Sequence, residues 1–170
     1  MSAALAAELR ARGGSLAASL PDGEPASGEG GPAQLAAAGP RARGREREYE
    51  LLLEMILEGS RLHYGRPEVL SCDDPDLALL LGDQLYAMGL AELAELGDLK
   101  AVAELADLIS LVAQAQAAEH DDLAAAVWTA GAAAIGWGST PEHETAKDLA
   151  RSGAEEAVAA LVRAAERAGS

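Results

Sequence analysis

Two glutamates and an aspartate are the residues of this 170-residue chain whose types and spacing could do chemistry. Glu54 and Glu58 stand one helical turn apart, so their carboxylates lie on one face of a predicted helix and could share a cation. Glutamates at this spacing are also ordinary on a solvated helix face, which is the interpretation we favour. Asp83 interrupts the apolar run Leu77–Leu90. A carboxylate buried there needs a partner or takes up a proton, so Asp83 is either a structural acid, which we favour, or the relic of an active-site wall.

The stretch Glu54–Leu93 resembles, without a gap, the first-aspartate-motif region of the all-helical polyprenyl diphosphate synthases. Gly65-Arg66-Pro67 matches the GxP turn of that family, and the same frame places Gly82-Asp83 on its GD helix. Glu54 and Glu58 then fall on the first and last acids of its DDxxD motif. The resemblance implies an isoprenoid-synthase-like bundle. It also makes Glu54, Glu58, Asp83 and Arg66 the candidates for facing Mg²⁺ and a diphosphate.

Most of the groups that bind diphosphate in that family are missing from this chain. Met55 replaces the middle aspartate, and His63 and Tyr64 stand where two arginines are expected. The lysine of the KTA motif is absent from Leu123–Gly136, and no second aspartate-rich motif follows. Ionisation of an allylic diphosphate needs metal ions and cationic groups at the leaving group. The resemblance therefore implies a protein with no catalytic residue and no firm cofactor.

The composition predicts an all-α fold. Hydrophobic residues make up 49% of the chain, but only 3% are aromatic and phenylalanine is absent, so leucine and alanine must fill the core. These are strong helix formers, and no segment alternates apolar and polar residues as a half-buried strand does. We expect a compact bundle of about five to six helices in a single domain, residues 45–170. Residues 1–44 are of low complexity and are expected to form a disordered tail, or to result from a start codon assigned too far upstream.

Capping residues, prolines and glycines mark the helix boundaries. Side-chain oxygens just before a helix accept hydrogen bonds from its first N–H groups. On this basis Asp74, Asp98 and Asp121 are predicted to cap helices, and the cluster Asp73, Asp74 and Asp76 marks a helix start rather than a metal site. The predicted helices cover residues 46–61, 74–95, 99–118, 121–135, 141–151 and 154–168.

The helical period also predicts which residues face the core. Gly82 and Gly89 share one stripe and should let a second helix approach closely. The helix over 99–118 should expose Lys100, Glu104, Asp107 and Gln114. The histidines lack any metal-binding spacing and are expected at the surface; they are His63, His120 and His143.

The net charge of −15 disfavours nucleic acid and anionic membranes as partners. The acids and bases of residues 1–44 cancel, so this charge belongs to residues 45–170. Cys72 is the only cysteine, which excludes an intramolecular disulfide and favours a reducing compartment. We see no signal peptide and no segment apolar enough to span a membrane, so a cytoplasmic location is expected.

Three functions remain open. The first is a non-catalytic protein acting by association, as a homodimer or with a catalytic prenyl synthase subunit. The second is an enzyme or binder that uses Glu54, Glu58 and Asp83 around a Mg²⁺-bound diphosphate. The third is a small acidic interaction protein whose likeness to the synthases is convergent.

Overall fold

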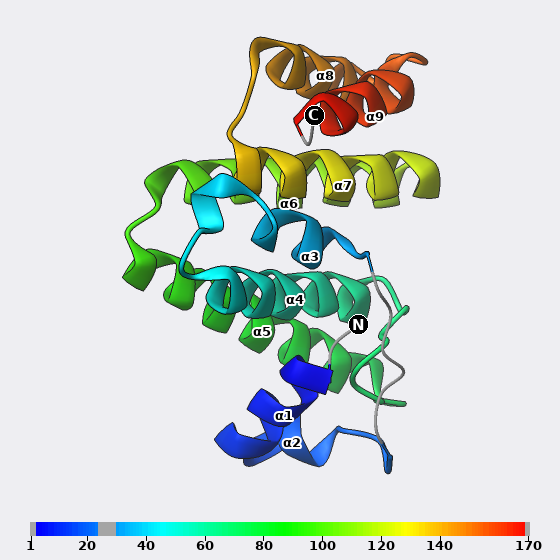
Figure 1. Ribbon diagram of the computed structural model, residues 1–170. Coiled ribbons are helices and arrows are strands. Elements are labelled where there is room, and N and C mark those ends of the chain that lie inside the picture. The colour runs from blue at the N-terminus through cyan, green and yellow to red at the C-terminus, as the bar shows by residue number, and fades with distance from the viewer. Residues whose placement is uncertain (1–2, 24–29, 169–170) are drawn as a thin grey trace. The chain divides into compact units, whose positions relative to one another are not determined.

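The computed structural model describes residues 3–23 and 30–168, and all the regular elements within them are helical (Figure 1). The described residues form nine α-helices and one 3-10 helix and contain no strand, so the all-α prediction is confirmed. Six of the α-helices lie in residues 46–168, and three shorter ones precede them.

The chain divides into two compact units instead of the single predicted domain. The first unit contains residues up to Ala33 together with Arg47–Gly97, and the second contains Gln34–Glu46 together with residues from Asp98 onward. Residues 1–44 thus contribute to both units. The described part of this segment departs from the expected tail because Leu5, Leu9 and Leu16 are buried, whereas residues 24–29 lie outside the described residues.

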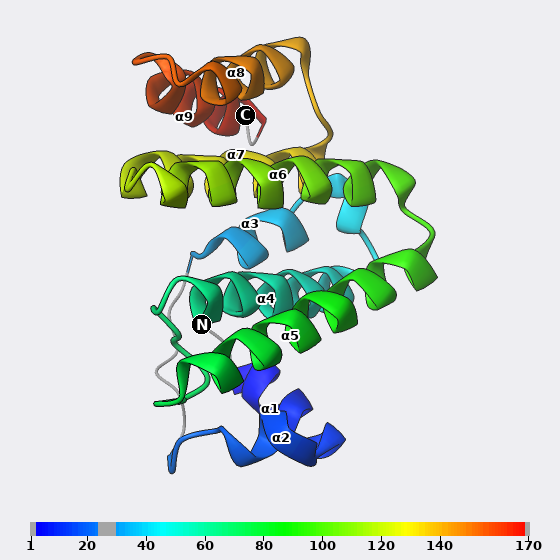
Figure 2. The ribbon, with the colours of Figure 1, turned by 180° about the vertical axis from the view of Figure 1, so that it is seen from behind.

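The first unit is built from α1 (Ala3–Arg12), α2 (Gly14–Ala18), α4 (Glu46–His63) and α5 (Pro75–Leu96). Helices α4 and α5 lie side by side in both views (Figures 1 and 2). A core of buried leucines, with Met55 and Val69, joins them to α1 and α2. Leu5, Leu9 and Leu16 supply the part of this core that comes from the low-complexity segment.

Glycines set the close contact between α4 and α5. A Cβ at Gly82 would lie 3.0 Å from the carbonyl oxygen of Gly59, and one at Gly89 would lie 2.5 Å from Ile56 Cγ1. Contacts this short leave no room for a side chain. The predicted glycine stripe is therefore confirmed as a helix-packing face.

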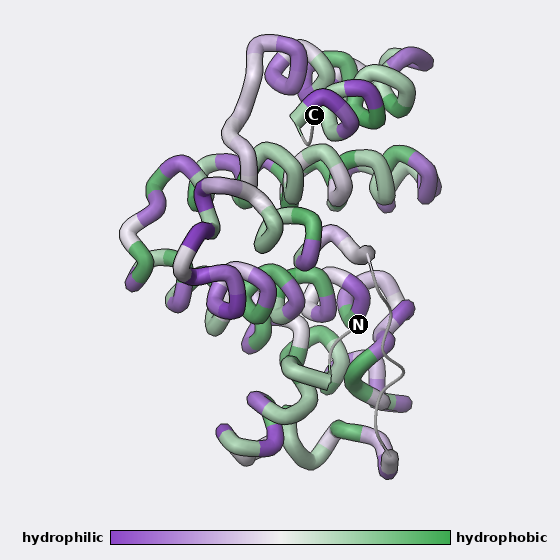
Figure 3. Tube along the Cα trace, in the orientation of Figure 1, coloured by the Kyte–Doolittle hydropathy of each residue, from purple (hydrophilic) through white to green (hydrophobic). Residues whose placement is uncertain are grey.

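The second unit contains α6 (Leu99–Ala117), α7 (Asp121–Trp137), α8 (Pro141–Ser152) and α9 (Ala157–Ala168). Helix α7 is coloured mainly as hydrophobic in Figure 3 and is buried along most of its length. The 3-10 helix η1 (Pro40–Ala42) lies against it, and α3 (Pro32–Ala37) crosses the division between the units. Arg41 of η1 donates to both carboxylate oxygens of Asp98 at 2.6 Å and to the Ile135 carbonyl at 2.9 Å.

Two of the three predicted aspartate caps are present. Asp74 accepts hydrogen bonds from the N–H groups of Asp76 and Leu77 at the start of α5, and Asp98 accepts one from Ala101 at the start of α6. The prediction for Asp121 is wrong. Glu119 turns the chain with φ 54°, and His120 Nδ1 caps α7 by accepting from Leu123 N at 3.2 Å.

Candidate functional site

Glu58 is fully buried and holds the loop that follows α4. Its Oε1 accepts hydrogen bonds from the backbone N–H groups of Glu68 at 3.0 Å, Val69 at 2.7 Å and Leu70 at 2.9 Å. Arg61 lies 3.7 Å from its other oxygen. Hydrogen bonds to a charged acceptor are the strong ones, so this carboxylate is committed to the loop. The expectation of a solvated helix face is wrong for Glu58, because the loop supplies donors that the helix itself lacks.

Glu54, one turn earlier, is buried without such partners. Its side chain is 8% exposed, and its Oε2 is a buried oxygen without a hydrogen-bond partner. Burial in the apolar interior, together with the charge of Glu50, raises the pKa of the Glu54 carboxyl to about 7. Glu54 is therefore an acid that changes charge near neutral pH, and it too departs from the expected solvated face.

Asp83 is exposed, contrary to the expectation of a buried structural acid. Its side chain is 70% exposed, with Oδ1 3.1 Å from His63 Nε2. The His63 ring stacks on Tyr86, with centroids 5.2 Å apart and planes 15° apart. The residues of α5 that contact α4 include Gly82, Leu85 and Gly89, and this register leaves Asp83 exposed.

The structure does not combine the four candidates into one site. Glu58 faces inward to its loop, whereas Asp83 faces solvent. Arg66 is exposed in the loop, and its backbone N–H donates a hydrogen bond to the Arg61 carbonyl at 2.8 Å. Over residues 3–23 and 30–168, no group of three or more His, Cys, Asp and Glu side chains is placed to hold a metal ion.

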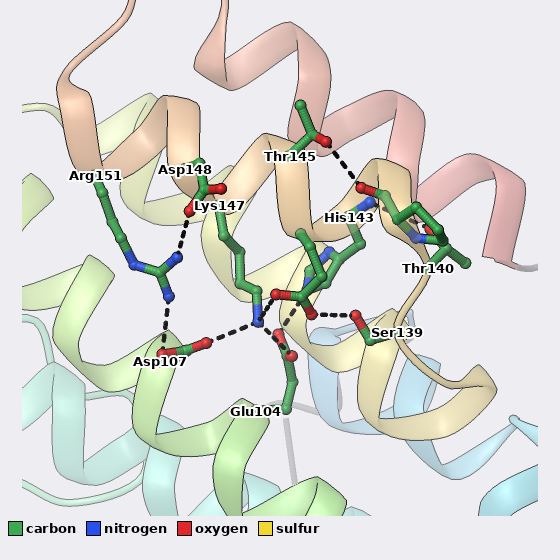
Figure 4. A network of polar contacts seen from close by, with 11 residues as sticks. Glu104, Asp107, Ser139, Thr140, His143, Thr145, Lys147, Asp148 and Arg151 are labelled. Carbon is green, nitrogen blue, oxygen red and sulfur yellow. Dashed lines mark hydrogen bonds and ion pairs between the residues drawn. The ribbon is translucent and has the colours of Figure 1, made fainter.

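The sequence interpretation missed a buried polar cluster in the second unit, which Figure 4 shows. Glu104 of α6 lies 2.6 Å from His143 Nε2 and accepts a hydrogen bond from Lys147 Nζ at 2.9 Å, both on α8. All three side chains are buried. The expectations of an exposed Glu104 and a surface His143 are therefore wrong. Ala101 and Leu108, one turn on either side of Glu104 and both buried, are the pattern that would have indicated its burial.

Lys147 is the centre of this cluster. Its ammonium also lies 2.8 Å from Asp107 and 3.1 Å from Glu144. Burial alone would lower the pKa of Lys147, but the hydrogen bonds that its ammonium donates to Asp107, Glu104 and Glu144 outweigh burial and raise that pKa above its usual range. A permanently charged and fully paired ammonium is a poor nucleophile. The cluster therefore joins α6 to α8 and does not form a reactive lysine site.

The first unit carries an exposed apolar surface on the first two turns of α5. We call Leu77, Leu79 and Leu80 the leucine patch; their exposed fractions are 38%, 44% and 66%. Beside it lies a pocket of about 590 Å³, lined by Leu62, Pro67, Leu70, Ser71, Cys72, Asp73, Pro75, Ala78, Leu79, His63 and Gly65. The sequence predicted no segment apolar enough to span a membrane, but α5 meets that test by length and composition, alone among the described helices, with 28% of its most apolar window buried.

No protein-family model, curated protein or solved structure matches this chain. The structure itself therefore gives the class of protein: the described residues form an all-helical protein with a leucine patch on α5.

Proposed function

We propose that this chain is a non-catalytic helical protein that acts by association, and that a helix of a partner protein contacts the leucine patch. The exposure of three leucines on the first two turns of α5 carries this proposal. Single exposed apolar residues are normal on soluble proteins, whereas neighbouring ones mark interaction surfaces, and Leu77 and Leu80 are neighbours one turn apart on α5. Fully burying an exposed leucine contributes about 1.5–3 kcal/mol, and covering the part of these three leucines that remains exposed contributes about half of that for each, which favours a contact at this surface.

We also propose that the likeness of Glu54–Leu93 to polyprenyl diphosphate synthases reflects shared ancestry. The GD helix lies at the subunit interface of that family, and Gly82-Asp83 of this chain lies on α5, which agrees with association through this helix. Prenyl transfer is disfavoured because the Glu58 carboxylate is engaged by three N–H groups. It would have to release its loop before it could bind Mg²⁺.

Charge favours a basic partner over a second copy of this chain. Asp76 and Asp83 stand one turn to either side of the leucine patch, and α5 carries no lysine or arginine. A second copy would bring these acids against one another, and each copy has a net charge of −15. A partner helix with lysines or arginines beside an apolar stripe complements both features. A catalytic synthase subunit fits if it presents such a helix.

Binding of a defined peptide to the full chain tests the proposal. The probe is a fluorescein-labelled 18-residue helical peptide with leucines on one face and lysines on the other; a second peptide has glutamate at every lysine position. We expect the lysine peptide to bind and the glutamate peptide not to bind. Leu80→Gln should weaken binding by about tenfold, equivalent to ~1.4 kcal/mol, because it removes apolar area from the contact. Leu99→Gln is the matched control, since Leu99 is 79% exposed on α6.

Three results would overturn the proposal. One is equal binding of the lysine peptide by wild type and Leu80→Gln. Another is a dimer in multi-angle light scattering that Leu80→Gln dissociates, which would assign the patch to a second copy. The third is flotation with phosphatidylcholine vesicles that Leu80→Gln abolishes, which would assign the patch to a lipid surface.

A further inference from the structure

We infer that the pocket beside the leucine patch is the anchor site for one bulky apolar side chain of the partner helix. This inference rests on the proposed function. It specifies where on the chain the partner helix binds and what kind of partner side chain enters the pocket. The pocket and the patch are continuous because Leu79 belongs to both. A helix lying over Leu79 and Leu80 would therefore present one of its own side chains at the mouth of the pocket.

Polar and apolar groups contribute about equally to the lining, which suits an apolar side chain with a basic residue beside it. Leu62, Leu70, Pro67 and Ala78 contribute apolar surface, and the volume of about 590 Å³ has room for a leucine or phenylalanine side chain. Asp73 is exposed at the rim. A lysine or arginine adjacent to the anchor would pair with this acid, as the charge of α5 already favours.

Glu58 pre-organises one wall of this pocket. Its carboxylate fixes the N–H groups of Glu68, Val69 and Leu70, and Leu70 lines the pocket. Further along, the N–H of Ser71 donates to the carbonyl of Ser19 at 2.8 Å. The loop is thus held by Glu58 and by Ser19, so it loses little conformational freedom when a partner binds. Less of the free energy of the contact is spent on ordering the loop, and the affinity is higher. Glu58 is thus a positioning residue for the pocket.

Filling the pocket is the first test. Ala78→Trp places a large ring at its wall, and we expect it to weaken binding of the leucine–lysine peptide by about tenfold. Ala113→Trp is the matched control, because Ala113 is exposed on α6 in the other unit. Circular dichroism should show equal helicity for both variants, so that the loss reports on the pocket and not on folding.

Cys72 provides a second test that needs no substitution. It lines the pocket and is the only cysteine of the chain, so a maleimide labels one known position. We expect saturating peptide to slow this labelling at least about tenfold, because the guest side chain covers the sulfur. The glutamate peptide should leave the rate unchanged.

The outcomes separate the inference from the proposed function. If the peptide binds and Leu80→Gln weakens it, but Ala78→Trp and Cys72 labelling show no effect, the anchor pocket is wrong and association through the leucine patch stands. If the peptide does not bind wild type, the proposed function falls and the anchor site falls with it.

Discussion

The Glu58 carboxylate accepts a hydrogen bond from the backbone N–H of Val69 at 2.7 Å, and both residues are buried. This bond and its two neighbours connect α4 to the loop that leads into α5. The residue that resembles a metal-binding acid in the sequence is, in the structure, the support for a loop.

Replacing Glu58 tests that role. Glu58→Gln keeps the shape and an acceptor oxygen for the three N–H groups but removes the charge, and its amide N–H₂ replaces the oxygen that lies near Arg61. We expect a loss of about 1–2 kcal/mol in the free energy of unfolding, measured by urea denaturation, because hydrogen bonds to a neutral acceptor are weaker than those to a charged one. Glu68→Gln, whose side chain is half exposed, should change it by less than about 0.5 kcal/mol. Equal effects of the two substitutions would contradict the loop-holding role.

The raised pKa of Glu54 predicts that the free energy of unfolding depends on pH. Its pKa is about 7 in the folded protein against an ordinary value of 4.5, so the folded state binds more protons between these values. Stability from this group is fully present below pH 4.5 and is lost as the pH rises through 7. The total loss is on the order of 3 kcal/mol.

The matched variant for this effect is Glu54→Gln, which is neutral at every pH. Urea denaturation at intervals between pH 4.5 and 8.5 should show a smaller decline for Glu54→Gln than for wild type. Glu50→Gln removes a neighbouring charge and should reduce the decline only in part. A wild-type stability that rises over this interval by the same amount as in Glu54→Gln would exclude the raised pKa.

Lys147 is expected to be required for the stability of the second unit. Lys147→Met leaves Glu104 as a buried carboxylate without its ammonium, which costs about 3–5 kcal/mol. Adding Glu104→Leu should recover most of that loss, because the uncompensated charge is then gone. Arg151→Met is the control, since its ion pairs lie at the surface and are worth about 0–1 kcal/mol. Thermal unfolding of the three proteins measures the difference, and similar losses for Lys147→Met and Arg151→Met would contradict it.

Replacing Gly89 by alanine is predicted to lower the stability of the protein, although alanine in place of glycine usually stabilises a helix. A Cβ there would lie 2.5 Å from Ile56 Cγ1 and 2.9 Å from the Leu52 carbonyl oxygen. Gly89→Ala should therefore destabilise the protein by about 1–3 kcal/mol although alanine is the better helix former. Gly31→Ala, where a Cβ meets nothing within 4 Å, should have little effect in the same urea titration. A gain in stability for Gly89→Ala would show that α4 and α5 are not in close contact there.

The sequence by itself determined the local features of this protein. The observed helices from α4 onward begin and end within a few residues of the predicted ones, because caps such as Asp74 and Asp98 and the glycine that ends α5 act within one turn. The stripe of Gly82 and Gly89 followed from the helical period alone. Caps, breakers and period depend only on neighbours along the chain.

Only the tertiary structure decided which charged side chains are buried. Glu58 and Glu104 are polar residues on helices, and each is buried because distant groups supply hydrogen bonds: a loop for Glu58, and α8 for Glu104. Asp83 is exposed because the packing of α5 on α4 sets its rotation. Leu5, Leu9 and Leu16 are buried because they pack with residues of α4, α5 and the loop between them in one core. These outcomes depend on partners far along the chain, which neither composition nor period specifies.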